Sequence, residues 1–264
     1  AQGSARQDIP AMLHEATNAL RGGRVDEARA LCQRILSTAP ENPAALNVLG
    51  AVEGRTGRFE AAVRLFDRAL ALDPDLADAH GNRGIALRQL GRLEEAAESL
   101  RSALRLNPAR IDTHAGLGIV LKSLGRHHEA LSSYDAALSL EPRNPGLWNN
   151  RGNALRAMGN ADEAVRSFDR AIELDGNFAD AYYNRGLALR DLGRDEDAVA
   201  SYDRCLALKA SNAAAWNNRG VALGALSRLG DALESYDRAI RLHPDFVEAR
   251  NNRGVVHLDQ GRPE

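Results

Sequence analysis

Cysteine, lysine and long apolar runs are all scarce in this sequence of 264 residues. Its two cysteines, Cys32 and Cys205, lie far apart, which excludes a disulfide framework and favours a reducing, cytoplasmic location. No apolar run approaches the roughly 18 residues that a membrane-spanning helix needs, so we expect no membrane insertion. Only Lys122 and Lys209 among the 34 basic residues are lysines, a bias that favours a bacterial source.

Motifs for catalysis, cofactors and nucleic acid are also missing. The 34 basic residues are balanced by 36 acidic ones, which is not the composition of a nucleic-acid-binding surface. The sequence has no glycine-rich phosphate loop, no His-Glu-x-x-His helix and no Cys-x-x-Cys pair. His80 and His114 share a repeat position, but no carboxylate or thiolate at suitable spacing completes a metal site. We therefore expect no catalysis, cofactor or metal in this segment.

The sequence is instead rich in one repeated pattern. The tripeptide Asn-Arg-Gly returns at 82–84, 150–152, 184–186, 218–220 and 252–254. Its glycine belongs to a series of marker glycines spaced 34 residues apart: Gly50, Gly84, Gly118, Gly152, Gly186, Gly220 and Gly254. A fixed period of this length predicts an array of structural repeats.

The period divides the chain into segments. Residues 1–8 are polar and are expected to be a disordered leader or a vector-derived remnant. The predicted array covers 9–264, with repeats at 9–42, 43–76, 77–110, 111–144, 145–178, 179–212 and 213–246 and a partial repeat at 247–264.

Each repeat carries the apolar spacing of two helices. In repeat six, Tyr182, Gly186 and Leu189 follow one helical face, and Ala198 and Tyr202 follow a second. A turn glycine separates the two helices in most repeats, and proline follows the second helix in many of them. The marker glycine and an alanine of the second helix predict a close approach of the two backbones. We therefore predict an all-α fold of stacked helix pairs.

These positions resemble the tetratricopeptide repeat family. Repeat five shows the resemblance at Trp148, Gly152, Gly159, Ala164, Phe168 and Ala171. The resemblance covers nearly the whole chain. It implies a right-handed superhelical solenoid of antiparallel helix pairs, with first helices on the concave face. It also implies a protein-interaction role.

An arginine stands before most marker glycines, where this family usually has leucine. Sixteen residues upstream of each arginine lies an aspartate: Asp67 for Arg83, Asp135 for Arg151, Asp169 for Arg185, Asp203 for Arg219 and Asp237 for Arg253. The arginine is replaced at Leu49 and Leu117, where the upstream residue is not acidic either. This pattern predicts a ladder of Asp–Arg pairs between repeats. The alternative is two independent surface columns.

Polar residues on the exposed stripe of the first helices are the candidate site. Asparagines recur there, and a side-chain amide matches a peptide unit of any sequence because it donates and accepts. We expect peptide contact from Asn82, Asn149, Asn150, Asn153, Asn184, Asn217, Asn218, Asn251 and Asn252. A basic row of Arg88, Lys122, Arg156 and Arg190 follows the same stripe. Local helix contacts or solvation are the alternative explanation.

The asparagine series also looks similar to the superhelical arm of O-linked N-acetylglucosamine transferases and related bacterial proteins. That similarity implies asparagines that hold a substrate peptide by its backbone. Asn149 and Asn217 replace basic residues that clamp chaperone carboxylates in other family members, which argues against such a clamp.

Two functions follow as hypotheses. The first is a non-catalytic scaffold that binds extended protein or peptide segments on its concave face. The alternative is the substrate-recruiting arm of a larger glycosyltransferase with its catalytic domain beyond Glu264. The last repeat leaves Val255, Val256 and Leu258 without a second helix to cover them. We therefore expect a fragment of a longer protein, with self-association through this end as a secondary hypothesis.

Overall fold

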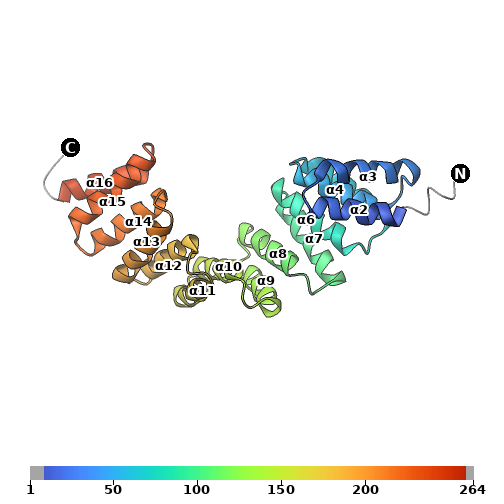
Figure 1. The fold of residues 1–264 in the computed structure, drawn as a ribbon. Coiled ribbons are helices and arrows are strands. Elements are labelled where there is room, and N and C mark those ends of the chain that lie inside the picture. The colour runs from blue at the N-terminus through green and yellow to red at the C-terminus, as the bar shows by residue number, and fades with distance from the viewer. Residues whose placement is uncertain (1–8, 260–264) are drawn as a thin grey trace. The chain divides into compact units, whose positions relative to one another are not determined.

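The computed structural model describes residues 9–259, and within that range it is built from fifteen helices with no strand (Figure 1). The first helices of the pairs are α2 (Ile9–Arg21), α4 (Pro43–Arg55), α6 (Ala77–Gln89), α8 (Ile111–Ser123), α10 (Pro145–Ala157), α12 (Ala179–Asp191), α14 (Ala213–Ala225) and α16 (Val247–Asp259). The second helices are α3 (Val25–Thr38), α5 (Phe59–Leu72), α7 (Leu93–Leu106), α9 (His127–Leu140), α11 (Ala161–Leu174), α13 (Asp195–Leu208) and α15 (Leu229–Leu242). The predicted all-α solenoid of antiparallel pairs is confirmed. The predicted leader at 1–8 and the last residues of the partial repeat lie outside the described residues.

Local chemistry starts and ends these helices. Asn42 and Asn144 accept hydrogen bonds from the backbone N–H groups of Ala45 and Leu147, and each precedes a proline at the first helical position. The predicted turn glycines lie in the left-handed region, with φ between 69° and 80°. Ser227 occupies the same turn position with φ 60°. A left-handed residue ends each first helix and reverses the chain into the second.

The marker glycines allow the two helices of a pair to touch. A Cβ at Gly152 or Gly186 would lie 2.6 or 2.5 Å from the aromatic ring of Phe168 or Tyr202. A Cβ at Gly84 would likewise lie 2.6 Å from the Leu100 side chain. Phe168, Tyr202 and Leu100 are all buried. The close approach predicted from glycine is confirmed, and these large side chains form the core between the helices.

The helices fall into two compact units, 1–140 and 141–264. Within each unit, successive first helices pack directly on one another, for example α4 on α6 and α12 on α14. Second helices pack on the first helices of their own repeat and of the next. The first helices are thus closely spaced, as expected for the inner side of each unit. We call the side of the first helices that points away from the second helices the first-helix face.

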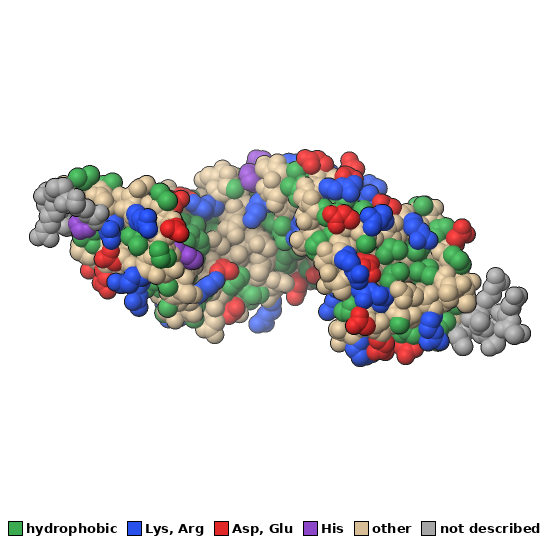
Figure 2. Space-filling model, turned by 90° about the horizontal axis from the view of Figure 1, so that it is seen from above, with side chains coloured by type: hydrophobic (Ala, Val, Ile, Leu, Met, Phe, Trp, Pro, Cys, Tyr) green, Lys and Arg blue, Asp and Glu red, His purple; other side chains and the backbone are tan. Residues whose placement is uncertain are grey.

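The rest of the surface is mixed in charge. Figure 2 shows Lys and Arg side chains interspersed with Asp and Glu over the side in view. Among the helices described, none combines the length and the apolar character that crossing a bilayer requires.

Candidate functional site

The asparagine series forms hydrogen bonds from repeat to repeat. The Asn82 side-chain amide donates to the side-chain oxygen Oδ1 of Asn47 at 3.1 Å, and that of Asn184 donates to Oδ1 of Asn149 at 2.9 Å. Asn252 donates to Asn217 at 3.0 Å, and Asn218 donates to the Tyr183 hydroxyl at 3.1 Å. Each donor is half-buried, and each bond spans 35 residues of sequence. The amides are therefore fixed in orientation by the preceding first helix.

The predicted asparagines thus divide into two groups. Asn149 and Asn217 are only 8% and 7% exposed, and both accept a bond from the next repeat. Their side-chain oxygens hold the amides of Asn184 and Asn252 in place. Asn150 and Asn153 are half-buried and Asn251 is exposed, and the side chains of these three residues have no hydrogen-bond partner among the described residues.

The basic row also differs along its length. Arg156 forms an ion pair with Asp191 at 2.6 Å, and Arg190 lies 3.8 Å from Asp195. Arg88 and Lys122 have no acidic partner within 4 Å in the described part of the chain. Uncompensated positive charge on this row therefore lies in the first unit.

The predicted Asp–Arg ladder is present inside both units. Arg83 lies 2.6 Å from Asp67, Arg185 lies 2.6 Å from Asp169, Arg219 lies 2.6 Å from Asp203 and Arg253 lies 3.0 Å from Asp237. These distances exclude independent surface columns for the four pairs. Asp135 and Arg151 belong to different units, and their pairing stays a prediction. The arginine side chains are 19–29% exposed and the aspartates 42–51%, so solvent weakens each pair.

A column of buried serines was not predicted. Ser201 accepts a hydrogen bond from Arg185 at 2.8 Å and donates to the Asp197 carbonyl oxygen at 2.9 Å. Ser99, Ser167 and Ser235 receive the same bond from Arg83, Arg151 and Arg219. Each arginine therefore connects its own second helix to its first, in addition to the aspartate. The serines follow the 34-residue period, so the sequence did contain this signal.

Indole and imidazole groups form hydrogen bonds with backbone carbonyl oxygens in the turns between repeats. The indoles of Trp148 and Trp216 donate to the carbonyl oxygens of Pro142 and Ala210 at 2.9 Å. His80 and His114 make the same 2.9 Å contact with the carbonyls of Pro74 and Pro108. The shared position of the histidines thus has a structural explanation in the turn between repeats.

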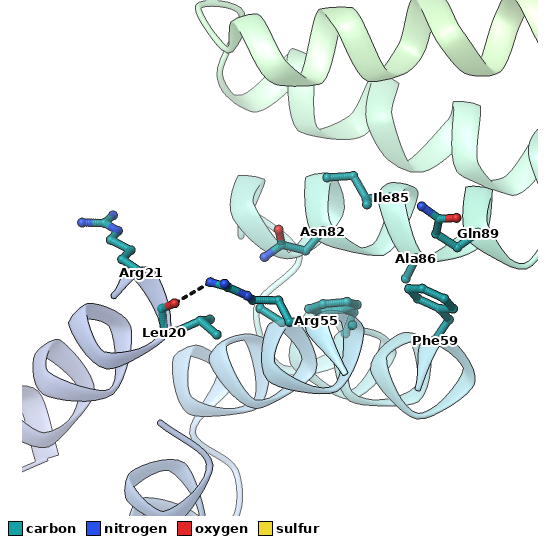
Figure 3. Close-up of a pocket in the computed structure, with 11 residues that line it drawn as sticks. Leu20, Arg21, Arg55, Phe59, Asn82, Ile85, Ala86 and Gln89 are labelled. Carbon is teal, nitrogen blue, oxygen red and sulfur yellow. Dashed lines mark hydrogen bonds between the residues drawn. The ribbon is translucent and has the colours of Figure 1, made fainter. Parts of the chain in front are cut away.

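An apolar pocket of about 450 Å³ opens between first helices of the first unit. It lies between α2, α4 and α6, with Phe59 and Phe66 of α5 on its inner side. Figure 3 shows Arg55 at one end, where its guanidinium donates to the Leu20 carbonyl, and Phe59 at the other. The pocket was not predicted from the sequence.

Family models identify the architecture. Models described as tetratricopeptide repeat match residues 13–74, 52–111 and 213–246, and a model described as TPR repeat matches 120–159, 152–190 and 186–227. Together these matches cover most of the chain. The chain belongs to the tetratricopeptide repeat family.

Solved tetratricopeptide repeat (TPR) structures agree. YrrB, a TPR protein with an unusual peptide-binding site, is 25% identical and has a TM-score of 0.59, with 70% of this chain and 96% of YrrB covered. A TPR protein from Parabacteroides merdae is 18% identical with a TM-score of 0.65, and 95% of this chain and 99% of that protein are covered. The Cut9–Hcn1 hetero-tetramer of APC/C gives 17% identity and a TM-score of 0.69, with coverage of 91% and 48%. No curated protein sequence matches this chain.

Proposed function

We propose that this chain is a non-catalytic, cytoplasmic interaction scaffold that binds extended protein or peptide segments along its first-helix face. The observation that carries this proposal is the row of fixed amides. Each of Asn82, Asn184, Asn218 and Asn252 donates only one N–H to the protein, which leaves its second N–H and its carbonyl oxygen for a ligand. The similarity to YrrB, which has a peptide-binding site, supports the same proposal.

Fixed amides suit this role because ordering a side chain on binding costs affinity. An extended peptide presents alternating N–H and C=O groups, and an amide side chain can pair with either. The positive charge at Arg88 and Lys122 would favour ligands with acidic residues at one end.

The test is selection of random 12-residue peptides displayed on phage, followed by titration of the selected peptides in labelled form. The parent chain is compared with a triple variant, Asn150→Ala, Asn184→Ala and Asn218→Ala. We expect the triple variant to lose about tenfold or more in affinity, because each amide hydrogen bond contributes about 0.5–1.5 kcal/mol.

Asn149→Ala is the matched control. It removes the support of the Asn184 amide but leaves that amide on the face, so a smaller loss is expected. Thermal unfolding of all variants separates binding from stability. Equal binding by the parent and the triple variant would instead place the site on the second helices.

The glycosyltransferase hypothesis rests on the asparagine series alone. Determining the coding sequence beyond Glu264 tests it, since a sugar-nucleotide-binding α/β domain would support it and further repeats or a stop would not.

Self-association stays a secondary proposal. Val255 and Leu258 on α16 are 57% and 67% exposed, which would favour contact with a second copy. A monomer mass that does not change with concentration in light scattering would contradict it.

A further inference from the structure

Two pockets open at the same position of the repeat, one in each unit. The second, of about 210 Å³, is lined by residues of α14, α15 and α16. Each of its lining residues stands 170 positions, or five repeats, after a residue that lines the first pocket. Gly224 thus corresponds to Gly54 and Tyr236 to Phe66.

A gap in the basic row explains both openings. Gly54 and Gly224 occupy the repeat position that holds Arg88, Lys122, Arg156 and Arg190 in the four repeats between them. A long side chain at this position lies along the first-helix face, whereas glycine leaves that space empty. The pockets therefore arise from substitutions at one defined position and recur in independent units.

The first pocket has the size and lining of a side-chain site. Its volume of about 450 Å³ lies within the range of roughly 300–1,000 Å³ typical of small-molecule sites, so it holds a leucine, methionine or phenylalanine side chain with room to spare. Phe59 and Ile85 form apolar walls, and Ile85 is 46% exposed in the empty pocket. Covering an exposed isoleucine with an apolar group is favourable.

The rim of this pocket is positively charged. Arg21 and Arg55 line it, both are exposed, and the described lining includes no acidic residue. The bond from Arg55 to the Leu20 carbonyl oxygen holds that guanidinium at the rim (Figure 3). This charge is complementary to a carboxylate beside the apolar side chain.

We infer that the pocket at Gly54 binds a large apolar side chain of an extended peptide whose neighbouring residue is acidic. The inference rests on the proposed peptide-binding function and adds the chemical class of the ligand. The pocket at Gly224 lacks the basic rim, because Asp191 and Ala225 stand where the first pocket has Arg21 and Arg55. The preference for an acidic neighbour is therefore specific to the first unit.

The same phage-displayed 12-residue peptides test this inference with the full chain. The parent is expected to enrich peptides in which a large apolar residue adjoins Asp or Glu. Gly54→Gln fills the pocket with a neutral polar chain and is expected to weaken binding of those peptides about tenfold or more, since about 1.4 kcal/mol is tenfold and a buried apolar side chain exceeds it.

Two variants are matched to Gly54→Gln. Gly54→Ala adds one methyl, whose only close neighbour is the Ala62 Cβ at 3.9 Å, and should keep parental affinity. Gly224→Gln fills the second pocket and should leave the apolar–acidic preference intact. Glutamine and alanine both exceed glycine in helix propensity, so loss of folding does not explain a loss of binding.

A double variant, Arg21→Gln and Arg55→Gln, should remove the preference for the acidic residue and retain that for the apolar one.

The outcomes are distinguishable. Peptides enriched by the parent and bound equally by Gly54→Gln would overturn the pocket inference and leave the proposed function standing. A parent that enriches no peptide would overturn both. Enriched peptides without an apolar–acidic pair would also overturn the pocket inference.

Discussion

The two compact units differ in how regularly side-chain hydrogen bonds connect their successive first helices. In the unit at 141–264, every marker glycine is preceded by Asn-Arg, and the amides of α12, α14 and α16 each donate to the preceding first helix. In the described part of the unit at 1–140, Asn82 is the only such donor, and leucines replace the arginine at 49 and 117. The second unit therefore has a regular polar face held together from repeat to repeat.

The irregular unit carries the features that would discriminate between ligands. It has the larger pocket and the uncompensated charges of Arg21, Arg55, Arg88 and Lys122. In the second unit, Arg156 is neutralised by Asp191 and the corresponding pocket is about half as large. Under the proposed function, regular repeats hold a peptide backbone and departures from the repeat select side chains.

The largest difference between the units is expected at alkaline pH. Burial raises the pKa of Tyr134 to about 12 and that of Cys32 to about 11 in the first unit. In the second unit, burial raises the pKa of four groups: Tyr183, Tyr202, Tyr236 and Cys205. In the unfolded chain cysteine releases its proton near pH 8.5 and tyrosine near pH 10. Stability is therefore present below those values and is lost as pH rises toward the folded pKa values.

Hydrogen exchange at about pH 8 and about pH 10.5 measures this loss unit by unit, after correction for the intrinsic rate. Protection should fall further in the second unit than in the first, and an equal or reversed fall would contradict the prediction. Tyr202→Phe provides the control, because the buried Tyr202 hydroxyl has no hydrogen-bond partner at normal distance among the described residues, and the Arg190 guanidinium lies near it. This variant should reduce the alkaline loss and stabilise the protein by about 1 kcal/mol near neutral pH.

The marker glycines provide the next largest effect. Gly186→Ala would place a Cβ 2.5 Å from the Tyr202 ring, so we expect a loss of about 2–3 kcal/mol in the free energy of unfolding. Gly84→Ala in the first unit should cost about as much, because its Cβ would lie 2.6 Å from Leu100 Cγ and 3.1 Å from the Ala96 backbone oxygen, which cannot move aside. Urea denaturation measures both losses.

Gly254→Ala is the control for these substitutions, since no atom of the described residues lies within 4 Å of the new Cβ. It should stabilise the protein slightly through helix propensity. Equal losses at positions 186 and 254 would show that steric contact with the second helix is not the cause.

A double-mutant cycle can convert one junction of the second unit into the form found in the first. Asp169→Gln with Arg185→Leu reproduces the Gln33 and Leu49 pair. Each single substitution should cost about 1 kcal/mol, because the pair is partly exposed and Arg185 also bonds Ser201. The double variant should lose less than the sum of the two, with a coupling of about 0.5–1 kcal/mol. Strict additivity would mean that the pair contributes nothing.

The fold was predictable because the same sequence pattern recurs in each repeat. Glycine, alanine and large side chains at fixed positions encode the same packing demand six times, from the repeat at 43–76 to the repeat at 213–246, so the helix pairs and the Asp–Arg pairs could be inferred from spacing. The serine column is equally periodic at Ser99, Ser167, Ser201 and Ser235, but the sequence alone assigns no role to a single serine on a helix.

The candidate site was less predictable because sequence spacing does not show how deeply a side chain lies. Asn149 and Asn217 share the stripe of the other asparagines, yet burial makes them supports. The pocket depends on an absent side chain at Gly54, and a glycine in a helix gives no indication of the space around it. That space is defined by Phe59, Phe66 and Ile85 from two other helices.

The smallest effect concerns the turns between paired helices. The described turns of the first unit use glycine, whereas Ser227 in the second unit adopts φ 60°, a conformation that costs L residues energy. Ser227→Gly should remove that strain but increase the freedom of the unfolded chain, for a net gain of about 0.5–1 kcal/mol. Gly193→Ser, at the equivalent turn with φ 69°, should lose a similar amount. Thermal unfolding of both variants tests the prediction as a pair, and a shift of the same sign in both would show that the left-handed turn does not limit stability here.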